Sequence, residues 1–312
     1  MKILLTTTSF QDTPGKHHDV LKNTGVEVDT LRGPVREEEL LPIIENYDGV
    51  ICGDDHYTRK VLEKGKEGKL KILSKYGIGL DKIDLKAAKE LGIEVTNCIG
   101  VNHVAVSEHI FALILTFYKN MVDEINYTKK GKWERLIGHE IYGMGIGVAG
   151  MGRIGKEVLL RAKAFGLKPY AFDKYIDEDF AEKNAVIICN TIEELATKVD
   201  ILSLNMDANK DNYHIINKKL LVNHSKKGQL LVNAARGELV DESAIIYGLE
   251  HSILSGYATD VLGQEPMNSN HPFQKLDNVI MTPHIASRTY ESVERQGIQA
   301  IKNLSNFIIE KL

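Results

Sequence analysis

Three glycines and an aspartate in the middle of the chain have a spacing that suits dinucleotide binding. Gly150, Gly152 and Gly155 follow a short apolar run as G-x-G-x-x-G, and Asp173 comes 18 residues after Gly155. In such a segment the first glycine permits a tight turn, the second lets a pyrophosphate approach, and the third lets a helix pack closely. The free N–H groups at the helix start attract the phosphates. A carboxylate at 173 would bind ribose hydroxyls and repel a 2′-phosphate, which favours NAD over NADP.

The glycine spacing alone is weak, because an ordinary glycine-rich turn can produce it by chance. The surrounding pattern strengthens it: an apolar run at 146–149, a helical pattern after the glycines, and a second apolar run at 169–172. We therefore predict a strand, a helix and a second strand around a dinucleotide site. Lys174 would soften the exclusion of NADP, unless it is a solvated surface lysine.

Three ionisable residues in the second half could act on the substrate of a nicotinamide cofactor. Arg236 lies in NAARGELVDE, Glu265 in DVLGQEP and His284 in TPHIAS. Hydride transfer at a carbon bearing oxygen needs a group that exchanges the oxygen's proton, and histidine suits this near neutral pH. A carboxylate can orient that histidine, and an arginine can bind a substrate carboxylate through two hydrogen bonds.

Each of these three residues also has a structural alternative. Arg236 could pair with Asp241 or Glu242, Glu265 could be an exposed loop residue, and His284 could be a turn residue after a proline. Their shared position at predicted strand ends, in a chain with a dinucleotide pattern, favours the catalytic interpretation.

Strand and helix patterns alternate along the chain, which predicts an α/β fold with parallel sheets. Candidate strands are 2–6, 26–30, 49–52, 72–75, 94–96, 201–204, 230–233, 256–260 and 279–281. Candidate helices between them include 37–45, 58–64, 85–91 and 241–251. We expect two doubly wound domains with a cleft between them. Residues 1–99 plus 286–312 would form a flavodoxin-like substrate-binding domain, and residues 100–285 a Rossmann NAD-binding domain.

Doubly wound sheets bind ligands beyond the carboxyl ends of their strands. This rule selects 205–209, 234–237, 260–265 and 282–287 as segments that face a ligand. The candidates for cofactor binding within them are Asn205, Met206, Asn209, Ala234, Ala235 and Asp260. In the first domain, Gly77-Ile78-Gly79 is either a turn whose N–H groups bind a carboxylate or a plain strand-to-loop turn. Asn102 could hydrogen-bond a ligand or cap a turn.

Two further helices are predicted from apolar spacing. Residues 100–120 contain a long helix that is apolar nearly all round, and so buried between domains or against another chain. The terminal helix 290–312 carries an apolar face and would return to the first domain. That face consists of Val293, Ile298, Ile301, Leu304 and Ile308.

The composition fits a two-domain protein and argues against several other classes. The chain has 312 residues, 43% of them hydrophobic, and a net charge of −4 that is mixed along its length. We therefore expect no nucleic-acid or membrane-surface partner. The N-terminus MKILLTTTSF is not a signal peptide, and no apolar stretch is long enough to span a bilayer. Cys52, Cys98 and Cys189 have no metal-like spacing, which predicts reduced cysteines, a cytoplasmic location and no metal.

Over nearly its whole length the chain resembles the D-isomer-specific 2-hydroxyacid dehydrogenase family, which includes D-3-phosphoglycerate dehydrogenase, glyoxylate and hydroxypyruvate reductases, and D-lactate dehydrogenase. The resemblance is carried by YGIGLDKID, LGIEVTN, Asn102, VSEH, GVAGMGRIG, NAARGELVDE, DVLGQEP and TPHIAS. It implies an NAD-dependent oxidoreductase in which His284 exchanges the proton, Glu265 supports His284, and Arg236 holds the 2-oxo acid.

The resemblance also implies binding roles. Arg153 and Ile154 would meet the pyrophosphate, Asp260 the nicotinamide amide, and the N–H groups of Gly77 to Gly79 the substrate carboxylate. Members of the family form dimers or tetramers through the cofactor domain, which fits the apolar helix at 107–120.

Two segments depart from the family pattern. After the fourth cofactor-domain strand, similar enzymes usually read LHLPLT, whereas this chain reads LNMDAN. Asp207 replaces the proline and Asn209 the threonine, which affects the adenine side and adds an argument against NADP. Phosphoglycerate enzymes often carry arginine where this chain has Asp54 and Asp55, so a phosphate there is disfavoured.

Other features bear on the substrate and on the class of protein. Arg59 and Arg288 could still serve an anionic substituent or be surface residues, and no C-terminal serine-sensing domain is expected after Leu312. We predict interconversion of a small D-2-hydroxy acid and its 2-oxo acid, with 3-phosphoglycerate, glyoxylate and hydroxypyruvate as candidates. The alternative is a non-catalytic NAD(H)-sensing protein on the same fold, although no disordered partner-binding tail is seen. Formate or phosphite oxidation would need a different active-site lining.

Overall fold

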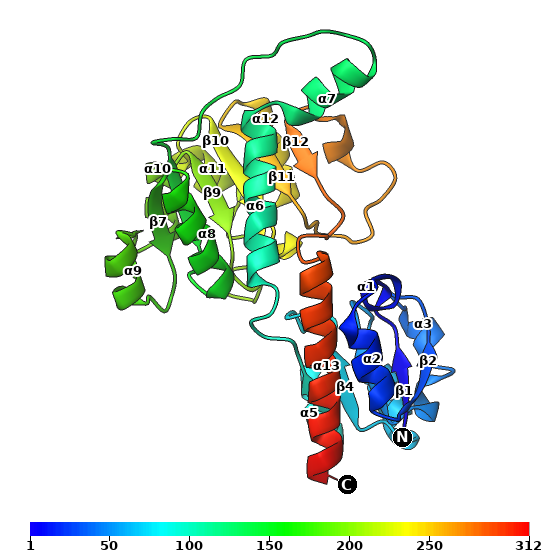
Figure 1. Ribbon diagram of the computed structural model, residues 1–312. Coiled ribbons are helices and arrows are strands. Elements are labelled where there is room, and N and C mark those ends of the chain that lie inside the picture. Colours follow the sequence, from blue (N-terminus) through cyan, green and yellow to red (C-terminus); the bar gives the residue numbers. More distant parts are fainter. Residues whose placement is uncertain (312) are drawn as a thin grey trace. The chain divides into compact units, whose positions relative to one another are not determined.

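The computed structural model describes residues 1–311, apart from the side chains of Ile308, Glu310 and Lys311. It divides into two compact units, Met1–Asn102 with Arg288–Leu312 (unit 1) and His103–Ser287 (unit 2) (Figure 1). Each unit contains one parallel sheet, so the predicted α/β class with two parallel sheets is confirmed. The predicted position of Ile308 on an apolar helix face, and Leu312, lie outside the described residues.

Unit 1 has five parallel strands in the order β2-β1-β3-β4-β5, the flavodoxin-like order. The strands are β1 (Lys2–Leu5), β2 (Glu27–Thr30), β3 (Gly49–Cys52), β4 (Ile72–Lys75) and β5 (Glu94–Thr96). The helices are α1 (Thr8–Asp12), α2 (Lys16–Asn23), α3 (Glu37–Leu40), η1 (Ile44–Asn46), α4 (Arg59–Glu67), α5 (Leu85–Leu91) and α13 (Tyr290–Lys311).

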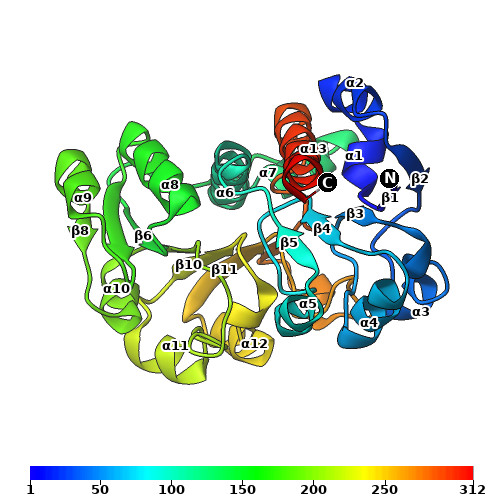
Figure 2. The same cartoon turned by 90° about the horizontal axis from the view of Figure 1, so that it is seen from below.

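Alternate strand residues of unit 1 point into two separate apolar cores. Leu4 and Leu73 pack with residues of α3, α4 and α5, whereas Ile3 and Ile72 pack with residues of α1, α2 and α13. Figure 2 shows these helices on both faces of the sheet. Because both of their faces are buried, the central strands β1, β3 and β4 read as mostly apolar runs, whereas the edge strands β2 and β5 carry charged residues.

Unit 2 has seven parallel strands in the order β12-β11-β10-β9-β6-β7-β8. The strands are β6 (Gly145–Ala149), β7 (Lys168–Phe172), β8 (Ile187–Ile188), β9 (Ile201–Leu204), β10 (Gln229–Asn233), β11 (Leu254–Thr259) and β12 (Val279–Met281). The chain adds β7 and β8 on one side of β6 and then returns to place β9 on the other. The switch point, where such sheets bind ligands, is therefore between β6 and β9.

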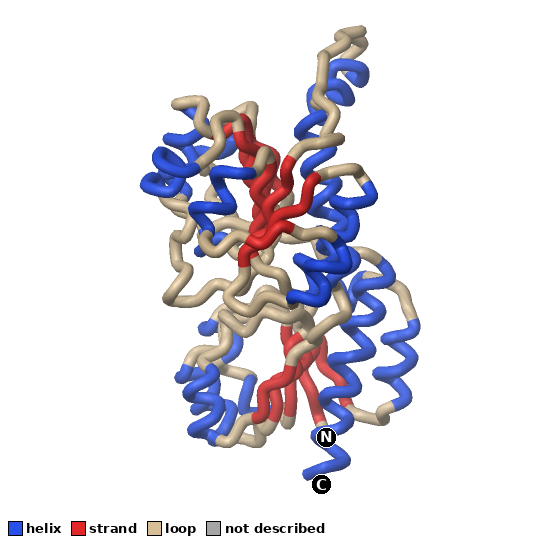
Figure 3. The backbone as a smooth tube through the Cα atoms, turned by 90° about the vertical axis from the view of Figure 1, so that its left-hand side faces the viewer, coloured by secondary structure: helices blue, strands red, loops and turns tan. Residues whose placement is uncertain are grey.

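The strands of unit 2 also lie between helices (Figure 3). The helices of the unit are α6 (His103–Tyr118), α7 (Met121–Lys129), α8 (Arg153–Ala164), α9 (Glu178–Asn184), α10 (Ile192–Lys198), α11 (Lys218–His224), η2 (Gly237–Leu239), α12 (Glu242–Glu250) and η3 (Pro272–Lys275), of which α7 projects away from the sheet. None of the helices within residues 1–311 combines the length and apolar character needed to cross a membrane.

Helix α6 packs differently from the sequence expectation. We expected its apolar surface to lie between domains or against another chain. Ile110, Phe111 and Ile114 are instead buried in the core of unit 2, in one cluster with Ile146 and Val148 of β6. A helix that packs against a sheet and a neighbouring helix is apolar on several sides, so its composition needs no external partner.

Sequence patterns missed α1, α2, α7, α9, α11 and β8, and the expected helix at 37–45 is instead the short α3 followed by η1. Helix α7 has no buried residue, and its three large apolar side chains, Met121, Val122 and Ile125, stand in a mostly polar stretch, so the segment does not have the pattern of a core-packed helix. The strands that were predicted lie within two residues of the observed bounds; β11, for example, begins at Leu254 instead of 256.

Candidate active site

The glycine-rich segment joins β6 to α8 at the switch point of the unit 2 sheet. Gly150 has φ +102°, and a Cβ there would lie 2.6 Å from the carbonyl oxygen of Asn205. A Cβ at Gly155 would lie 2.0 Å from the carbonyl oxygen of Gly150, whereas one at Gly152 would meet open space. The fold therefore requires glycine at 150 and 155, and the backbone at 152 is accessible to a ligand. Arg153 and Ile154 begin α8 directly after this opening.

Asp173 lies beside the glycine loop, at the end of β7. One of its carboxylate oxygens accepts a hydrogen bond from the Met151 N–H, and the other accepts one from the Tyr175 N–H at 2.9 Å. Each oxygen keeps further lone-pair capacity, so these bonds leave room for ribose hydroxyls. The structure thus brings Asp173 to the glycine loop, and its contact with a ribose stays a prediction.

The segment after β9 forms the other side of the switch point. The Asn205 N–H donates to the Ala149 carbonyl at 2.7 Å, and Asn205 Oδ1 is buried without a hydrogen-bond partner among the described residues. This unused acceptor beside the glycine loop fits a donor group on a bound dinucleotide. The Asn212 amide holds the rest of the segment, with Nδ2 3.4 Å from Met206 Sδ and Oδ1 accepting from the Asn209 N–H at 2.7 Å.

Arg236 follows β10 in a turn that is shaped by the buried side chain of Asn233. That side chain accepts from the Ala235 N–H at 3.1 Å and donates to the Arg236 carbonyl at 2.9 Å. Ala234 and Ala235 link the strand to the arginine, and Arg236 Nη1 donates to the Ala235 carbonyl at 2.7 Å. The turn places a half-buried guanidinium at the carboxyl end of the sheet.

Gly237 brings the arginine turn against the loop that carries Glu265. A Cβ at Gly237 would lie 2.1 Å from the carbonyl carbon of Leu262 and 2.4 Å from the nitrogen of Gly263. The two backbones are therefore in direct contact, which no residue larger than glycine allows without a shift. This contact sets the separation between the Arg236 turn and the Glu265 loop.

Glu265 and His284 form the pair that the sequence suggested. His284 Nδ1 lies 2.7 Å from Glu265 Oε2, and Glu265 Oε1 accepts from the Leu262 N–H at 2.9 Å. Their side chains are 35% and 38% exposed, so the pair is open to solvent and to small molecules. The three candidate residues lie in one unit, at the ends of β10, β11 and β12.

Asp260 holds the loop on both sides of His284, whose φ of +53° is in the left-handed region. The carboxylate is 1% exposed and accepts three hydrogen bonds from this loop. The donors are the Thr282 hydroxyl at 2.6 Å, the Ile285 N–H at 2.9 Å and the Ala286 N–H at 2.7 Å. Burial alone would raise the pKa of Asp260, but hydrogen bonds from His109 and these donors outweigh it and lower the pKa. The expected contact of Asp260 with the nicotinamide stays a prediction.

Sequence patterns did not single out His109, which lies on α6 and is mostly buried. Its Nε2 atom is 2.9 Å from Thr282 Oγ1 and 3.5 Å from Asp260 Oδ1. Because the Thr282 hydroxyl donates to Asp260, it accepts from His109. The signal available in the sequence was the motif VSEH, which ends at His109 and was counted toward the family resemblance without a role for the histidine.

In unit 1, Gly77-Ile78-Gly79 forms a turn after β4. Gly77 has φ +124°, its carbonyl accepts from the Cys98 N–H at 2.8 Å, and the Ile78 carbonyl accepts from the Asn97 amide at 2.7 Å. Asn102 ends the first segment of this unit, and its buried Oδ1 has no hydrogen-bond partner among the described residues. This oxygen makes no turn-capping hydrogen bond to a described residue, and the contact of Asn102 with a ligand stays a prediction.

Lys75 was also missed by the sequence patterns. It is 4% exposed, and its ammonium donates to the Gly53 carbonyl and to Asp54 Oδ1, both at 2.6 Å. A Cβ at Gly77 would lie 4.0 Å from this ammonium, so a buried cation adjoins the glycine turn. Asp55, which we grouped with Asp54 as disfavouring a phosphate, is fully buried, and burial raises its pKa.

Comparison with known proteins shows which family the chain resembles. Residues 111–286 match the family described as D-isomer specific 2-hydroxyacid dehydrogenase, NAD binding domain. A D-3-phosphoglycerate dehydrogenase from Methanocaldococcus jannaschii is 36% identical over 300 residues, covering 95% of this chain and 55% of that protein. A glyoxylate reductase from Korarchaeum cryptofilum is 35% identical over 245 residues, covering 77% of this chain and 73% of that protein.

The fold of the chain also matches that of a solved dehydrogenase structure. The apo-structure of D-lactate dehydrogenase from Escherichia coli matches with a TM-score of 0.88 at 27% identity, covering 100% of this chain and 98% of that one. The chain spans about half the length of the phosphoglycerate dehydrogenases that it matches. The resemblance drawn from the sequence motifs is confirmed.

Proposed function

We propose that this chain, which belongs to the D-isomer-specific 2-hydroxyacid dehydrogenase family, is an NAD-dependent enzyme that interconverts a small D-2-hydroxy acid and its 2-oxo acid. The hydrogen bond between His284 and Glu265 carries the proposal, because a histidine that exchanges protons needs a group to orient it. Both residues follow strands of the sheet that also carries the glycine loop.

The proposed roles follow from the geometry. When bound, NADH supplies the hydride that reduces the carbonyl carbon. His284 would protonate the carbonyl oxygen through Nε2, because Nδ1 faces Glu265. Glu265 stabilises the protonated imidazole, and Arg236 binds the substrate carboxylate and polarises the carbonyl. In the oxidation direction His284 would accept the proton.

Cofactor binding is assigned to residues 100–285, and substrate binding to residues 1–99 with 286–312. The pyrophosphate would meet Gly150, Gly152, Arg153, Ile154 and Gly155, and Asp173 would bind the adenine ribose. The open space at Gly152 and the unused Oδ1 of Asn205 support this assignment. In unit 2 the substrate carboxylate would be bound by Arg236. In unit 1 the N–H groups of Gly77 to Gly79 and the side-chain N–H₂ of Asn102 are the candidate donors to an anion.

The surroundings of Lys75 favour a substrate without a phosphate. A buried ammonium beside the glycine turn could bind a second anionic group, but Asp54 already pairs with it at 2.6 Å. Arg59 is paired with Glu90 at 2.7 Å, and Arg288 donates to the Thr8 hydroxyl at 3.0 Å. Small 2-oxo acids such as glyoxylate, hydroxypyruvate and pyruvate are therefore expected to react better than a phosphorylated acid.

A substrate panel tests the proposed function. NADH consumption would be followed with glyoxylate, hydroxypyruvate, pyruvate, 2-ketoisocaproate, oxaloacetate and 2-oxoglutarate, and NAD reduction with 3-phosphoglycerate. We expect clear turnover of at least one unphosphorylated acid, with little or none of 3-phosphoglycerate. Tight NADH binding without turnover of any acid would contradict the enzyme and favour the NAD(H)-sensing alternative.

We also propose that the protein forms a homodimer or homotetramer through α7 and the segment after it. This segment leads out from unit 2 in Figure 1, and it exposes large apolar side chains. They are Met121, Val122, Ile125, Trp133, Leu136, Ile137 and Tyr142, with Trp133 84% and Ile137 93% exposed. Surfaces of this kind usually mark an interface. Light scattering of wild type and Ile137→Lys should show an oligomer that the substitution dissociates; a monomeric wild type would contradict this.

A cytoplasmic location is proposed as well. Its support is that Cys52, Cys98 and Cys189 are unpaired and buried, as expected for a reducing compartment.

A further inference from the structure

The loop that carries Glu265 is exposed along most of its length. It comprises residues 261–270, between β11 and η3, and residues 263–270 are all exposed. An exposed segment gains little from apolar packing, so hydrogen bonds must determine where its side chains lie. The catalytic role proposed for Glu265 therefore depends on what anchors this loop.

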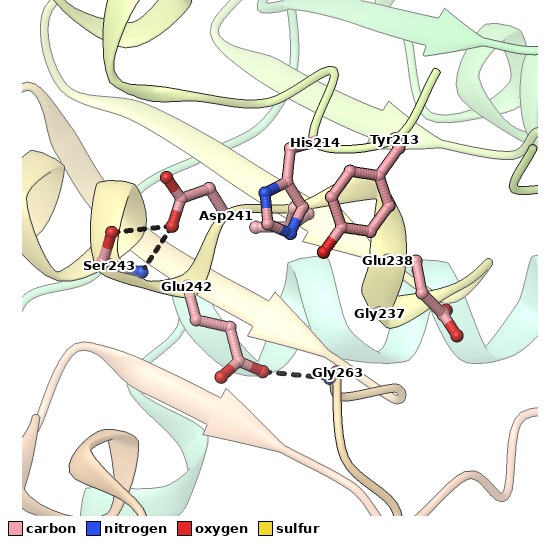
Figure 4. Close-up of a pocket in the computed structure, with 9 residues that line it drawn as sticks. Tyr213, His214, Gly237, Glu238, Asp241, Glu242, Ser243 and Gly263 are labelled. Carbon is pink, nitrogen blue, oxygen red and sulfur yellow. Dashed lines mark hydrogen bonds between the residues drawn. The ribbon is translucent and has the colours of Figure 1, made fainter. Parts of the chain in front are cut away.

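Glu242, the first residue of α12, binds both ends of the loop. Its Oε1 accepts from the Gly263 N–H at 3.0 Å, as Figure 4 shows, and its Oε2 lies 3.1 Å from His271 Nε2. His271 directly follows the loop and is 8% exposed. One carboxylate therefore connects the beginning of the loop, two residues before Glu265, with its end.

A further contact determines which nitrogen of His271 donates. The Phe273 N–H donates to His271 Nδ1 at 3.3 Å, so a neutral His271 carries its proton on Nε2 and donates it to Glu242. Glu242 thus accepts from two donors, one at each oxygen. A glutamine has only one acceptor oxygen and would face one of the two donors with its own N–H₂ group.

We propose that Glu242 and His271 act together as positioning residues that hold Glu265 in hydrogen-bond contact with His284. The catalytic consequence of this inference rests on the proposed function, whereas the anchoring itself does not. Glu242 binds the Gly263 N–H, and Gly263 lies two residues before Glu265 in the same loop. Fixing Gly263 therefore fixes Glu265, which makes the 2.7 Å hydrogen bond to His284. Gly237, against which Leu262 and Gly263 pack, limits the movement of the loop on one side.

The kinetic test compares Glu242→Gln with Glu238→Gln. Both glutamates line the pocket drawn in Figure 4, so each substitution removes an equal charge from it. We expect Glu242→Gln to lower kcat by about tenfold or more, as loss of a group that orients an active-site residue does. The Kd for NADH should stay within about twofold of wild type, because the glycine loop is untouched. The alkaline limb of the pH profile for reduction should move to lower pH, as in Glu265→Gln, while Glu238→Gln should match wild type. An unchanged kcat and pH profile in Glu242→Gln would overturn the proposal.

A second measurement does not depend on turnover. Hydrogen exchange of residues 262–270 should be faster in Glu242→Ala and in His271→Ala than in wild type, and unchanged in Glu238→Gln. The double variant should exchange no faster than the faster single variant, because both substitutions break the same network of hydrogen bonds around Glu242. Unchanged exchange in Glu242→Ala would contradict the anchoring. If wild type turned over no substrate while exchange still increased, the proposed function would fail and the anchoring would stand.

Discussion

Gly237 and Leu262 are in direct backbone contact, so close that a Cβ on Gly237 would lie 2.1 Å from the carbonyl carbon of Leu262. Gly237 follows Arg236, and Leu262 donates its N–H to Glu265 at 2.9 Å. The contact therefore links the residue proposed to bind the substrate to the residue proposed to support the proton donor.

Replacing Gly237 by alanine should displace the Glu265 loop. We expect Gly237→Ala to lower kcat/KM by about a hundredfold and the free energy of unfolding by about 1–3 kcal/mol, the usual cost of overpacking. Gly53→Ala is the control, because its Cβ would have its nearest contact at 3.6 Å. Steady-state kinetics and urea denaturation measure both effects. Wild-type kinetics in Gly237→Ala would show that the loop position does not matter.

Replacing His284 should remove the proposed proton exchange without removing the cofactor. We expect His284→Ala to lower kcat by about 10²–10⁴-fold, the range for loss of a general acid or base. NADH binding, measured by fluorescence titration, should remain. Glu265→Gln should lower kcat by a smaller factor than His284→Ala. It should also move the alkaline limb of the pH profile for reduction to lower pH, since a neutral amide no longer stabilises protonated His284. His251→Ala, at the exposed end of α12, is the matched control. A similar rate for His284→Ala and wild type would exclude the assigned role.

Replacing Asp173 should weaken the preference for NADH. Asp173→Ser keeps a hydroxyl near the Met151 and Tyr175 N–H groups but removes the charge that would bind ribose hydroxyls and repel a 2′-phosphate. We expect the Kd for NADH to rise by about tenfold, as loss of a hydrogen bond to a charged group does. The Kd for NADPH should fall, while Asp179→Ser on α9 should change neither. An unaltered ratio of the two Kd values would refute the role of Asp173.

His17 should make unit 1 sensitive to mild acid. His17 is buried against Phe10, its Nε2 lies 3.1 Å from the Phe10 carbonyl, and burial lowers its pKa below the ordinary value of 6.5. Below pH 6.5 the unfolded chain binds a proton that the native His17 resists, so the free energy of unfolding should fall as the pH falls. His17→Gln keeps a donor for the Phe10 carbonyl but does not titrate.

Urea denaturation of the two proteins at several pH values between about 7.5 and 5.5 measures this contribution. The difference in stability between wild type and His17→Gln should shift in favour of the variant as the pH falls. If the free energies of unfolding of wild type and His17→Gln changed in parallel with pH, His17 would not contribute to the acid sensitivity.

Local features of the sequence determined much of the fold and the identity of the candidate residues. The strands 49–52, 72–75 and 201–204 are observed as predicted, because a strand buried on both faces is a short apolar run between turns. The glycine loop and Asp173 were recognisable because turn, helix and acid follow each other at a fixed spacing. Arg236, Glu265 and His284 were found because the end of a strand can be located from its own residues.

Tertiary packing decided the relationships that make these residues a site. The Glu265–His284 bond joins residues 19 positions apart, the Glu242–Gly263 bond 21, and the His109–Thr282 bond 173. No pattern within one segment encodes such pairings, because they depend on which strands become neighbours and on how closely their connecting loops pack. The same holds for helix α6, whose apolar surface the sequence displayed without showing that the sheet of its own unit would cover it. Periodicity and turn chemistry are local properties, whereas the partner of a buried or hydrogen-bonding side chain is set by the whole fold.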